Sequence, residues 1–327
     1  MKVILSRKGF DSSYGGIPSP IFRHPDGSLS LHSLPIPSTP ANIGYEDIRW
    51  SGGNLQDLVS SLRCRHKARL PNTPHLDPDL VRDSLDDRHA EWRPIYGQSG
   101  NAETQLTNEG VHNPSDLKNR PLFLFFGWFR ETRKTPYGYS YVRDSPDVHA
   151  LFGWLQVEQK IAVTDHSRIA SEMPWTASHP HVVREDNNRV ANSIYVAPKP
   201  GAGTDRLILG GRDTQLPASG VFSRFDPEIH VLTKKGRTRS HWILPSWFYR
   251  GGDPRLGMHT KLSCWTPTPN SEMVELQSVG RGQEFVFEST EHDEPSVFDW
   301  VERIVRAGQP SSMPVSGQEV IGAANIG

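Results

Sequence analysis

The sequence predicts an α+β protein with a β-rich core, either barrel-like or a mixed sheet, and a few peripheral helices. Three observations support this prediction. Apolar runs of strand length recur along the chain, glycine and proline interrupt them often, and helical spacing of apolar residues is confined to a few segments. We expect one elaborated domain over residues 1–307 and a disordered tail over 308–327, where small and polar residues prevail.

Several segments have the composition of strands. A short apolar run predicts a strand at residues 2–6, and the turn signal His-Pro-Asp-Gly predicts a hairpin over residues 21–29. The runs at 122–126 and 150–155 are apolar on both faces, so they belong inside a sheet. Each belongs to a Phe-Gly-Trp segment, whose glycine indicates a bend or a close approach of two backbones. Further strands are expected at 193–196, 207–209, 228–232 and 284–287.

Helices are expected in three places. Apolar residues have helical spacing over residues 55–62, which predicts a short amphipathic helix. Asp77-Pro78 supplies an N-cap carboxylate and a first-turn proline. A third helix is expected to begin at Ser296, with Val297, Val301, Ile304 and Val305 along one face. Residues 94–120 contain few large apolar groups and are expected to form a long polar connection.

Charge and cysteine content exclude some classes of protein. The 36 basic and 37 acidic residues give a net charge of -1, so the chain lacks the global positive charge typical of non-specific nucleic-acid binding. Cys64 and Cys264 are too few for a disulfide framework, which fits a reducing compartment. With neither a secretory leader nor an apolar stretch of membrane-spanning length, we expect a cytoplasmic protein without a membrane partner.

The glycine-rich segment over residues 7–16 is the first candidate for a functional site. It follows a predicted strand, and its glycines allow backbone N–H groups to approach an anion. The Asp11 carboxylate is a candidate general base, metal ligand or nucleophile, while Lys8 can bind phosphate. Ser12 and Ser13 are candidate substrate ligands. The alternative is a turn in which Asp11 and Ser12 bond to nearby backbone groups.

Two histidine-containing segments are candidates for metal or acid/base chemistry. His75, Asp77 and Asp79 place an imidazole and two carboxylates within five residues, which suits either role. Helix capping explains the two aspartates as well. His179 and His181 could lie on one strand face as two zinc ligands, but the sequence shows no third ligand near them.

The polar residues Arg281, Gln283 and Glu284 stand before an apolar strand, where side chains can converge on a pocket. Glutamine and arginine suit the edges of a base, and arginine also suits a phosphate. A solvent-exposed hairpin turn is the alternative. Trp128 and Trp154 are candidates for stacking on a base, although tryptophans are more often core residues.

Three basic stretches could bind phosphate locally, at residues 63–69, 130–134 and 234–239, and each can also be a solvated turn. Arg130 begins the second stretch. A different pattern, Asp147 followed by Glu158-Gln159-Lys160, matches the skeleton of the restriction-nuclease signature. The apolar run between its two halves is explained equally well as core.

Several motifs taken together resemble the nucleotide modification associated domain, type three. They are KGFDS at 8–12 with GGIPSPI at 15–21, HLDPDL at 75–80, LFLFFGWFR at 122–130, HALFGWL at 149–155 and RGQEFV at 281–286. This resemblance covers about residues 1–305. It implies that the chain handles nucleotides or modified bases in DNA, alongside other proteins of a DNA-modification or phage-defence system.

We therefore expect an enzyme that modifies bases of DNA or nucleotides, with a composite acid/base site around Asp11. The alternatives are a module that reads modified bases without catalysis, built on a PUA-like barrel, and a magnesium-dependent nuclease. The residues assigned to catalysis are Asp11, His75, Asp77, Asp79 and Glu284. Those assigned to the substrate are Lys8, Ser12, Ser13, Trp128, Arg130, Trp154, Arg281 and Gln283. The metal and any cofactor stay open.

Overall fold

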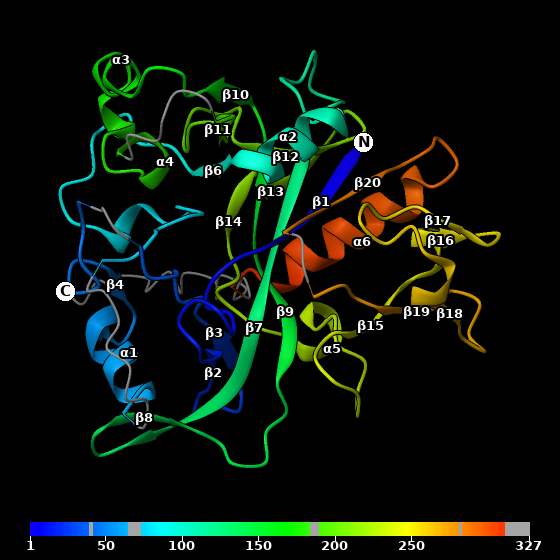
Figure 1. Cartoon of the computed structure of the whole chain (residues 1–327), viewed down its shortest axis with the longest axis horizontal. Coiled ribbons are helices and arrows are strands. Elements are labelled where there is room, and N and C mark those ends of the chain that lie inside the picture. The colour runs from blue at the N-terminus through cyan, green and yellow to red at the C-terminus, as the bar shows by residue number, and fades with distance from the viewer. Residues whose placement is uncertain (39–41, 65–72, 184–189, 281–282, 311–327) are drawn as a thin grey trace, which may run out of the picture.

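A mixed sheet of eight strands forms the centre of the computed structural model, which describes residues 1–38, 42–64, 73–183, 190–280 and 283–310 (Figure 1). Its main path runs in the order β14-β9-β7-β1-β20, and β2 and β8 also pair with the long strand β7. The strands are β1 (Lys2–Arg7), β2 (Ser19–Arg23), β3 (Leu29–Leu31), β7 (Leu122–Thr135), β8 (Gly138–Tyr141), β9 (Val148–Gln156), β14 (Ser219–Val221) and β20 (Glu284–Glu288).

Smaller sheets and six α-helices surround this centre in the described part of the chain. One three-stranded sheet contains β6 (Ile95–Ser99), β10 (Gln159–Ala162) and β11 (Asn192–Val196), and another contains β15 (His241–Pro245), β18 (Trp265–Pro267) and β19 (Met273–Gln277). Two-stranded pairs are β4 (Arg49–Trp50) with β5 (Gly53–Asn54), β12 (Arg206–Leu209) with β13 (Arg212–Pro217), and β16 (Tyr249–Arg250) with β17 (Asp253–Pro254). The helices are α1 (Leu55–Leu62), α2 (Gly100–Asn108), α3 (His166–Glu172), α4 (Pro180–Val183), α5 (Pro227–His230) and α6 (Glu294–Ala307).

The first strand, β1, lies between β7 and β20 and is parallel to the former and antiparallel to the latter. Leu5 of β1 therefore has Leu124 on one side and Phe285 on the other. Because β1 and β20 run in opposite directions, the carboxyl end of β1 meets the amino end of β20, with Ser6 opposite Glu284. This pairing brings residues 7–9 and 283–284 together although they are far apart in the sequence.

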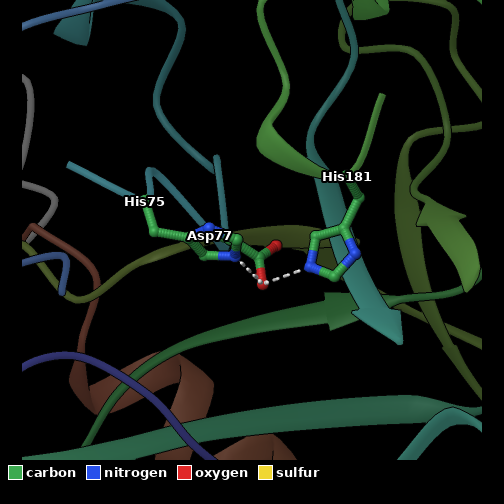
Figure 2. Close-up of side chains that lie close together, drawn as sticks. All are labelled: His75, Asp77 and His181. Carbon is green, nitrogen blue, oxygen red and sulfur yellow. Dashed lines mark ion pairs between the residues drawn. The ribbon is translucent and has the colours of Figure 1, made fainter. Parts of the chain in front are cut away.

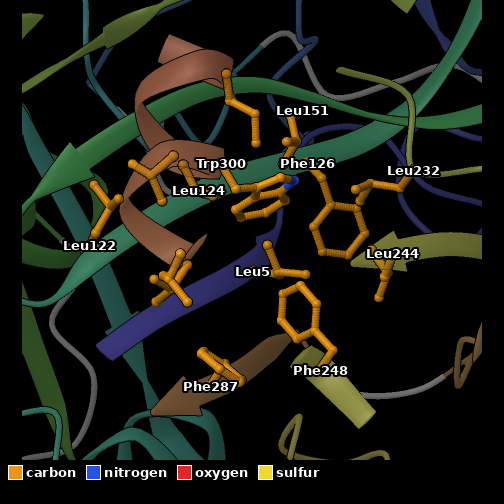
Figure 3. Close-up of a cluster of buried hydrophobic side chains, with 14 of the residues drawn as sticks. Leu5, Leu122, Leu124, Phe126, Leu151, Leu232, Leu244, Phe248, Phe287 and Trp300 are labelled. Atoms are coloured by element: carbon orange, nitrogen blue, oxygen red, sulfur yellow. The ribbon is translucent and has the colours of Figure 1, made fainter. Parts of the chain in front are cut away.

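The central sheet is apolar on both faces, as the uninterrupted apolar runs predict. Alternate residues of β7 point to opposite sides, so Leu122 and Leu124 belong to one core cluster and Phe123 and Phe125 to another. Helix α6 covers the first face, where Trp300 lies close to the leucines of β1 and β7 (Figure 3). Tyr96 of β6 and Tyr195 of β11 pack on the second face.

The two Phe-Gly-Trp segments pair with each other, and the expected close approach of backbones is confirmed. Phe125 of β7 lies opposite Gly153 of β9, and the register shifts by a bulge just after this pair. A side chain at Gly153 would place its Cβ 2.8 Å from the carbonyl oxygen of Gly220. A side chain at Gly127 would place its Cβ 2.7 Å from the carbonyl oxygen of Lys8. Both glycines therefore let a neighbouring segment lie directly against the strand.

Most of the predicted elements are present, and the α+β class is confirmed. Strand content of 35% against 20% helix makes the structure β-rich. The strands at 2–6, 193–196, 207–209 and 284–287, the hairpin over 21–29 and the helix over 55–62 all form within a residue or two of the expected bounds. The last helix begins at Glu294 instead of Ser296, and its four predicted apolar residues are buried.

Of the two expected core architectures, the described strands form the mixed sheet and no closed barrel, so no PUA-like barrel is present in them. Three expectations about the fold are wrong. Asp77-Pro78 begins no helix, because Asp77 accepts a hydrogen bond from Gly97 of β6 instead of capping a turn. Residues 94–120 contain β6 and α2 rather than a plain connection. Residues 227–230 form the short helix α5, which Asp226 caps, where a strand was expected.

Most of the tail expected over residues 308–327 lies outside the described residues, which end at Pro310. No helix among the described residues has the length and apolar character needed to cross a membrane.

We expect Gly153→Ala to lower the free energy of unfolding by about 1–3 kcal/mol, because the added methyl group would overpack the β9–β14 contact. Urea unfolding of the two proteins measures this difference. Gly280→Ala is the matched control, since a Cβ at Gly280 would meet no atom within 4 Å. A Gly153→Ala protein at least as stable as the wild type would contradict the close approach.

Candidate metal centre

A cleft of about 400 Å³ opens where the end of β1 and the start of β20 meet β6 and α4. This main cleft has polar walls, which fits a charged or hydrogen-bonding ligand. Its polar lining residues include Arg7, Lys8, Asp11, His75, Asp77, Gln98, His181 and Gln283. Five residues assigned to the site from the sequence thus line one cleft, namely Lys8, Asp11, His75, Asp77 and Gln283.

Two imidazoles and one carboxylate point toward a common position in the main cleft (Figure 2). The Oδ2 atom of Asp77 lies 4.0 Å from Nε2 of His75 and 3.8 Å from Nε2 of His181. One ligand atom from each of the three residues lies within 4.8 Å of the ligand atoms of the other two. His75 and Asp77 come from the segment before β6, whereas His181 comes from α4, more than a hundred residues later.

The hydrogen bonds of Asn192 fix which nitrogen of His181 carries the proton. The Asn192 amide nitrogen donates to the backbone carbonyl of His181 at 2.9 Å, so the amide oxygen faces the imidazole. That oxygen lies 2.9 Å from Nδ1 of His181 and accepts its N–H. The lone pair of Nε2 therefore points at the Asp77 carboxylate. Two electron-pair donors that face each other in this way need a proton or a cation between them.

Burial keeps both imidazoles neutral at physiological pH. It lowers the pKa of His75 to about 3 and that of His181 to about 4, against a partly compensating attraction from Asp77. Burial also opposes ionisation of Asp77, but the contact with His179 and the charge of Lys8 outweigh it and hold the Asp77 pKa well below its usual range. Neutral imidazoles and an ionised carboxylate are the forms that bind a metal ion.

The residue types and their number fit a divalent transition metal. Two imidazoles and one carboxylate occur in catalytic zinc sites and in non-haem iron sites. Ligand atoms that bind one ion at about 2.1 Å lie roughly 3–3.5 Å from one another. The three side chains must therefore move slightly closer together to bind an ion. Only three protein ligands leave positions open for a substrate or water, as in a catalytic site rather than a structural one.

The fully buried carboxylate of Glu284 lies behind the three ligands. Its Oε1 atom accepts hydrogen bonds from the Tyr96 hydroxyl at 2.7 Å, the Gln98 amide at 2.7 Å and the Ser6 hydroxyl at 3.1 Å. The Nζ atom of Lys8 lies 3.5 Å from the same oxygen and 3.9 Å from Oδ2 of Asp77. Lys8 therefore connects Glu284 electrostatically with the candidate metal ligands.

Gly97 of β6 supports two of the ligands at once. Its backbone N–H donates to Oδ1 of Asp77 at 2.7 Å, which leaves Oδ2 to face the imidazoles. A Cβ at this position would lie 2.3 Å from a ring carbon of His181, so only glycine leaves room for the imidazole. The position of the ligands thus depends on a residue that has no side chain.

The comparisons with known proteins place the chain in a family. Residues 2–288 match the model of a family described as nucleotide modification associated domain 3. The chain belongs to this family. No curated protein and no solved structure matched the chain.

The nucleotide modification associated domain 3 match includes every residue of the candidate metal centre and of the Glu284 cluster, while α6 begins beyond its end. The resemblance found from the sequence motifs is confirmed. The family's description associates the chain with nucleotide modification and names no reaction.

Other residues assigned to the site lie around or away from the main cleft. Asp11 lines the cleft, and its Oδ1 accepts the backbone N–H groups of Ser13 at 2.7 Å and Tyr14 at 2.6 Å. This is the turn that the sequence offered as the alternative to a reactive carboxylate. Ser12, Ser13 and Trp128 line a separate hollow beside the cleft.

Three assigned residues have other partners and do not line the main cleft. Asp79 forms a two-point ion pair with Arg88, at 2.6 and 2.7 Å. Arg130 donates to the carbonyl of Arg143 and lies 3.8 Å from Asp147. Trp154 is 1% exposed, stacks on Phe222 and donates to the carbonyl of Pro217, so neither face of its ring is open to a base. Arg281 lies outside the described residues.

Sequence reasoning missed three residues of the site. His181 was considered only with His179, because its partners His75 and Asp77 are distant in sequence. Tyr96 and Gln98 lay in a segment taken for a connection. The sequence carries little local signal for them, since β6 reads Ile-Tyr-Gly-Gln-Ser and is buried at its first four residues.

We expect Gly97→Ala to weaken metal binding by about tenfold or more, because the methyl group would displace the His181 ring without removing a ligand. Titration with Co(II), followed by visible absorption, measures the affinity. Circular dichroism of the same samples shows whether the fold is kept. Unchanged Co(II) affinity in a folded Gly97→Ala protein would argue against a metal site that includes His181.

We expect Glu284→Gln to lower the free energy of unfolding by about 3–5 kcal/mol, because Lys8 would keep a buried charge without its nearest partner. Glu288→Gln, on the same strand, removes an exposed ion pair with Lys2 and should cost less than about 1 kcal/mol. If urea unfolding shows that the two changes lower the free energy of unfolding equally, Glu284 does not stabilise the buried charge of Lys8.

Proposed function

We propose that this chain is a metal-dependent enzyme that changes a nucleotide base or a substituent on the base. The observation that carries the proposal is the group formed by His75, Asp77 and His181, with neutral imidazoles, an ionised carboxylate and an open cleft in front. The family description supplies the nucleotide part of the proposal. The three ligands supply the chemical part.

A bound divalent ion in this position would polarise a substrate group or activate water. The protein's own residues would do the rest. Asp77 and the two imidazoles would hold the ion, and Asn192 would keep Nε2 of His181 free to bind it. Lys8 places a positive charge at the edge of the ligand group, where it attracts an anionic part of the substrate.

A side-chain amide on the cleft wall can recognise a base. Gln98 and Gln283 both line the cleft, and the Gln98 amide nitrogen donates to Glu284 and to the Gln283 side-chain oxygen, while the Gln98 oxygen accepts the Ser99 N–H. The Gln283 amide offers two donor hydrogens and an acceptor lone pair, which suits the edge of a base. We assign Gln283 to the substrate, Gln98 to the orientation of Gln283, and Glu284 to the support of Lys8, Tyr96 and Gln98.

The proposal moves the reacting centre away from Asp11. The Oδ1 atom of that carboxylate is occupied by two backbone N–H groups, whereas Oδ2 of Asp77 faces two imidazoles. Asp11 shapes the loop at the rim of the cleft. Asp79, engaged by Arg88, supports the segment that carries the ligands.

A modified-base reader is the second candidate, because Trp128 is only partly buried and lies in a hollow next to the cleft. Such a module would bind without turnover. The nuclease hypothesis gains no support, since its three residues belong to different ion pairs. Asp147 lies near Arg130, Glu158 binds Arg93 and Arg120, and Lys160 binds Glu103.

The test combines metal binding with product analysis. Protein freed of metal with a chelator is loaded with Fe(II), Mn(II), Co(II) or Zn(II) and incubated with nucleotides and DNA that carry modified or ordinary bases. Nucleoside mass spectrometry then detects any altered base. We expect metal-dependent turnover that falls at least about 100-fold in Asp77→Asn and His181→Ala, while exposed His112→Ala keeps the wild-type rate.

Either of two results would overturn the proposal. The first is a protein that binds none of the four ions at His75, Asp77 and His181. The second is turnover that persists unchanged in Asp77→Asn. Tight binding of modified bases with every ion and no product would favour the reader instead.

A further inference from the structure

A second hollow, of about 240 Å³, adjoins the main cleft and is called the side hollow here. The two cavities share the walls formed by Arg7, Lys8, Asp11 and Gly280. The far wall of the side hollow comes from Trp128 of β7 and from Arg239, which precedes β15. A ligand long enough to reach past Lys8 can therefore occupy both cavities.

The side hollow carries positive charge that the protein does not neutralise by ion pairs. Within the described ranges, no carboxylate lies within 4.0 Å of a guanidinium nitrogen of Arg7 or Arg239. Arg7 donates to the backbone carbonyls of Val279 and Gly280 at 2.9 and 3.0 Å, and its Nε has no partner there. Asp11 is the one acidic residue among the described lining residues. An anion would restore the balance.

The guanidinium of Arg239 is held in place before any ligand arrives. Its central carbon lies 4.1 Å from the centre of the Trp128 ring, and its Nη2 donates to the Ser12 hydroxyl at 2.7 Å. Stacking on an indole and one hydrogen bond leave other N–H groups of the planar fork for a ligand. A fixed fork of this kind binds phosphate oxygens at two points.

The indole of Trp128 adds a second unused donor. Its Nε1 atom is shielded from solvent and has no hydrogen-bond partner among the described residues. A buried N–H without an acceptor costs stability, and such groups commonly mark a place that a ligand completes. Trp128 and Arg239 both line the side hollow.

We propose that the side hollow binds the phosphate of a nucleoside phosphate whose base enters the main cleft. This inference rests on the proposed function, and it narrows the substrate to phosphorylated nucleotides as opposed to free bases or nucleosides. A free nucleotide carries a phosphate monoester and a nucleotide within a strand carries a phosphodiester, and both present anionic phosphate oxygens. The hydroxyls of Ser12 and Ser13 and the forks of Arg7 and Arg239 are the groups that meet the phosphate oxygens.

The experiment measures binding directly, without turnover. Isothermal titration compares each deoxynucleoside, its 5′-monophosphate and a short single-stranded oligonucleotide on the wild-type chain, with and without Co(II). We expect at least one monophosphate or oligonucleotide to bind about tenfold or more tightly than the matching nucleoside. Arg239→Gln should abolish most of this preference, and Arg239→Lys should restore part of it.

The matched control is Arg237→Gln, which removes the same charge from an exposed position two residues away, outside the side hollow. It should keep the preference for phosphate. Failure of both the monophosphate and the oligonucleotide to bind more tightly than the nucleoside, no binding of any probe, or equal losses in the two arginine variants would overturn the inference. Preference for the oligonucleotide alone assigns the phosphate to a strand, and preference for the monophosphate assigns it to a free nucleotide.

Metal binding separates this inference from the proposed function. Arg239→Gln should bind Co(II) as tightly as the wild type, because Arg239 is not one of the three metal ligands. A protein that binds Co(II) at His75, Asp77 and His181 but ignores phosphate refutes the side hollow alone. Phosphate preference in a protein that binds no metal refutes the metal-dependent enzyme and leaves the side hollow in place.

Discussion

The buried carboxylate of Glu284 is the interaction on which the arrangement of the cleft depends. A fully buried charge is costly, so its donors must be present together and well placed. They come from two distant parts of the chain, since Ser6 and Lys8 lie at and just after the end of β1 whereas Tyr96 and Gln98 belong to β6. The carboxylate therefore links the central sheet to the three-stranded sheet of β6, β10 and β11. Gly97 and Asn192 of that sheet position the candidate metal ligands.

Rigid elements hold the candidate ligands through their backbone and through short side chains. Gly97 donates to Asp77, and Asn192 of the adjacent strand β11 sets the tautomer of His181. Strands hold such groups more closely than loops do, because each backbone group is paired on either side. His75 and Asp77 lie on an irregular segment and His181 lies on the short helix α4, whereas Gly97 and Asn192 belong to strands.

Local patterns in the sequence predict those parts of the fold that depend on neighbouring residues. Helix α1 follows from the spacing of its leucines, and β7 and β9 follow from continuous apolar runs. Strand β6 was missed because Tyr96 and Gln98 give it a polar composition, and both side chains donate to Glu284, far along the chain. Helix capping at Asp77 failed for the same reason, since its partner is Gly97 of another element.

The candidate site likewise contains residues that local sequence patterns predict and residues that they do not. Lys8, Asp11, His75 and Asp77 were found because each lies in a short, chemically dense segment. The union of His75 and Asp77 with His181 depends on the packing of α4 against β6, which no local pattern encodes. Trp128 and Trp154 have the same sequence context, yet one lines a hollow and the other is core, because β7 and β9 face different neighbours at those positions.

The position of β20 in the central sheet has a consequence for the order of events during synthesis. Until residues 284–288 have been made, β1 lacks its antiparallel partner and Lys8 lacks its buried counter-charge. The three candidate metal ligands are synthesised much earlier, since the last of them is residue 181. The histidines of the candidate site are thus synthesised before the last of the residues that position them. The cleft is complete only when β20 pairs with β1.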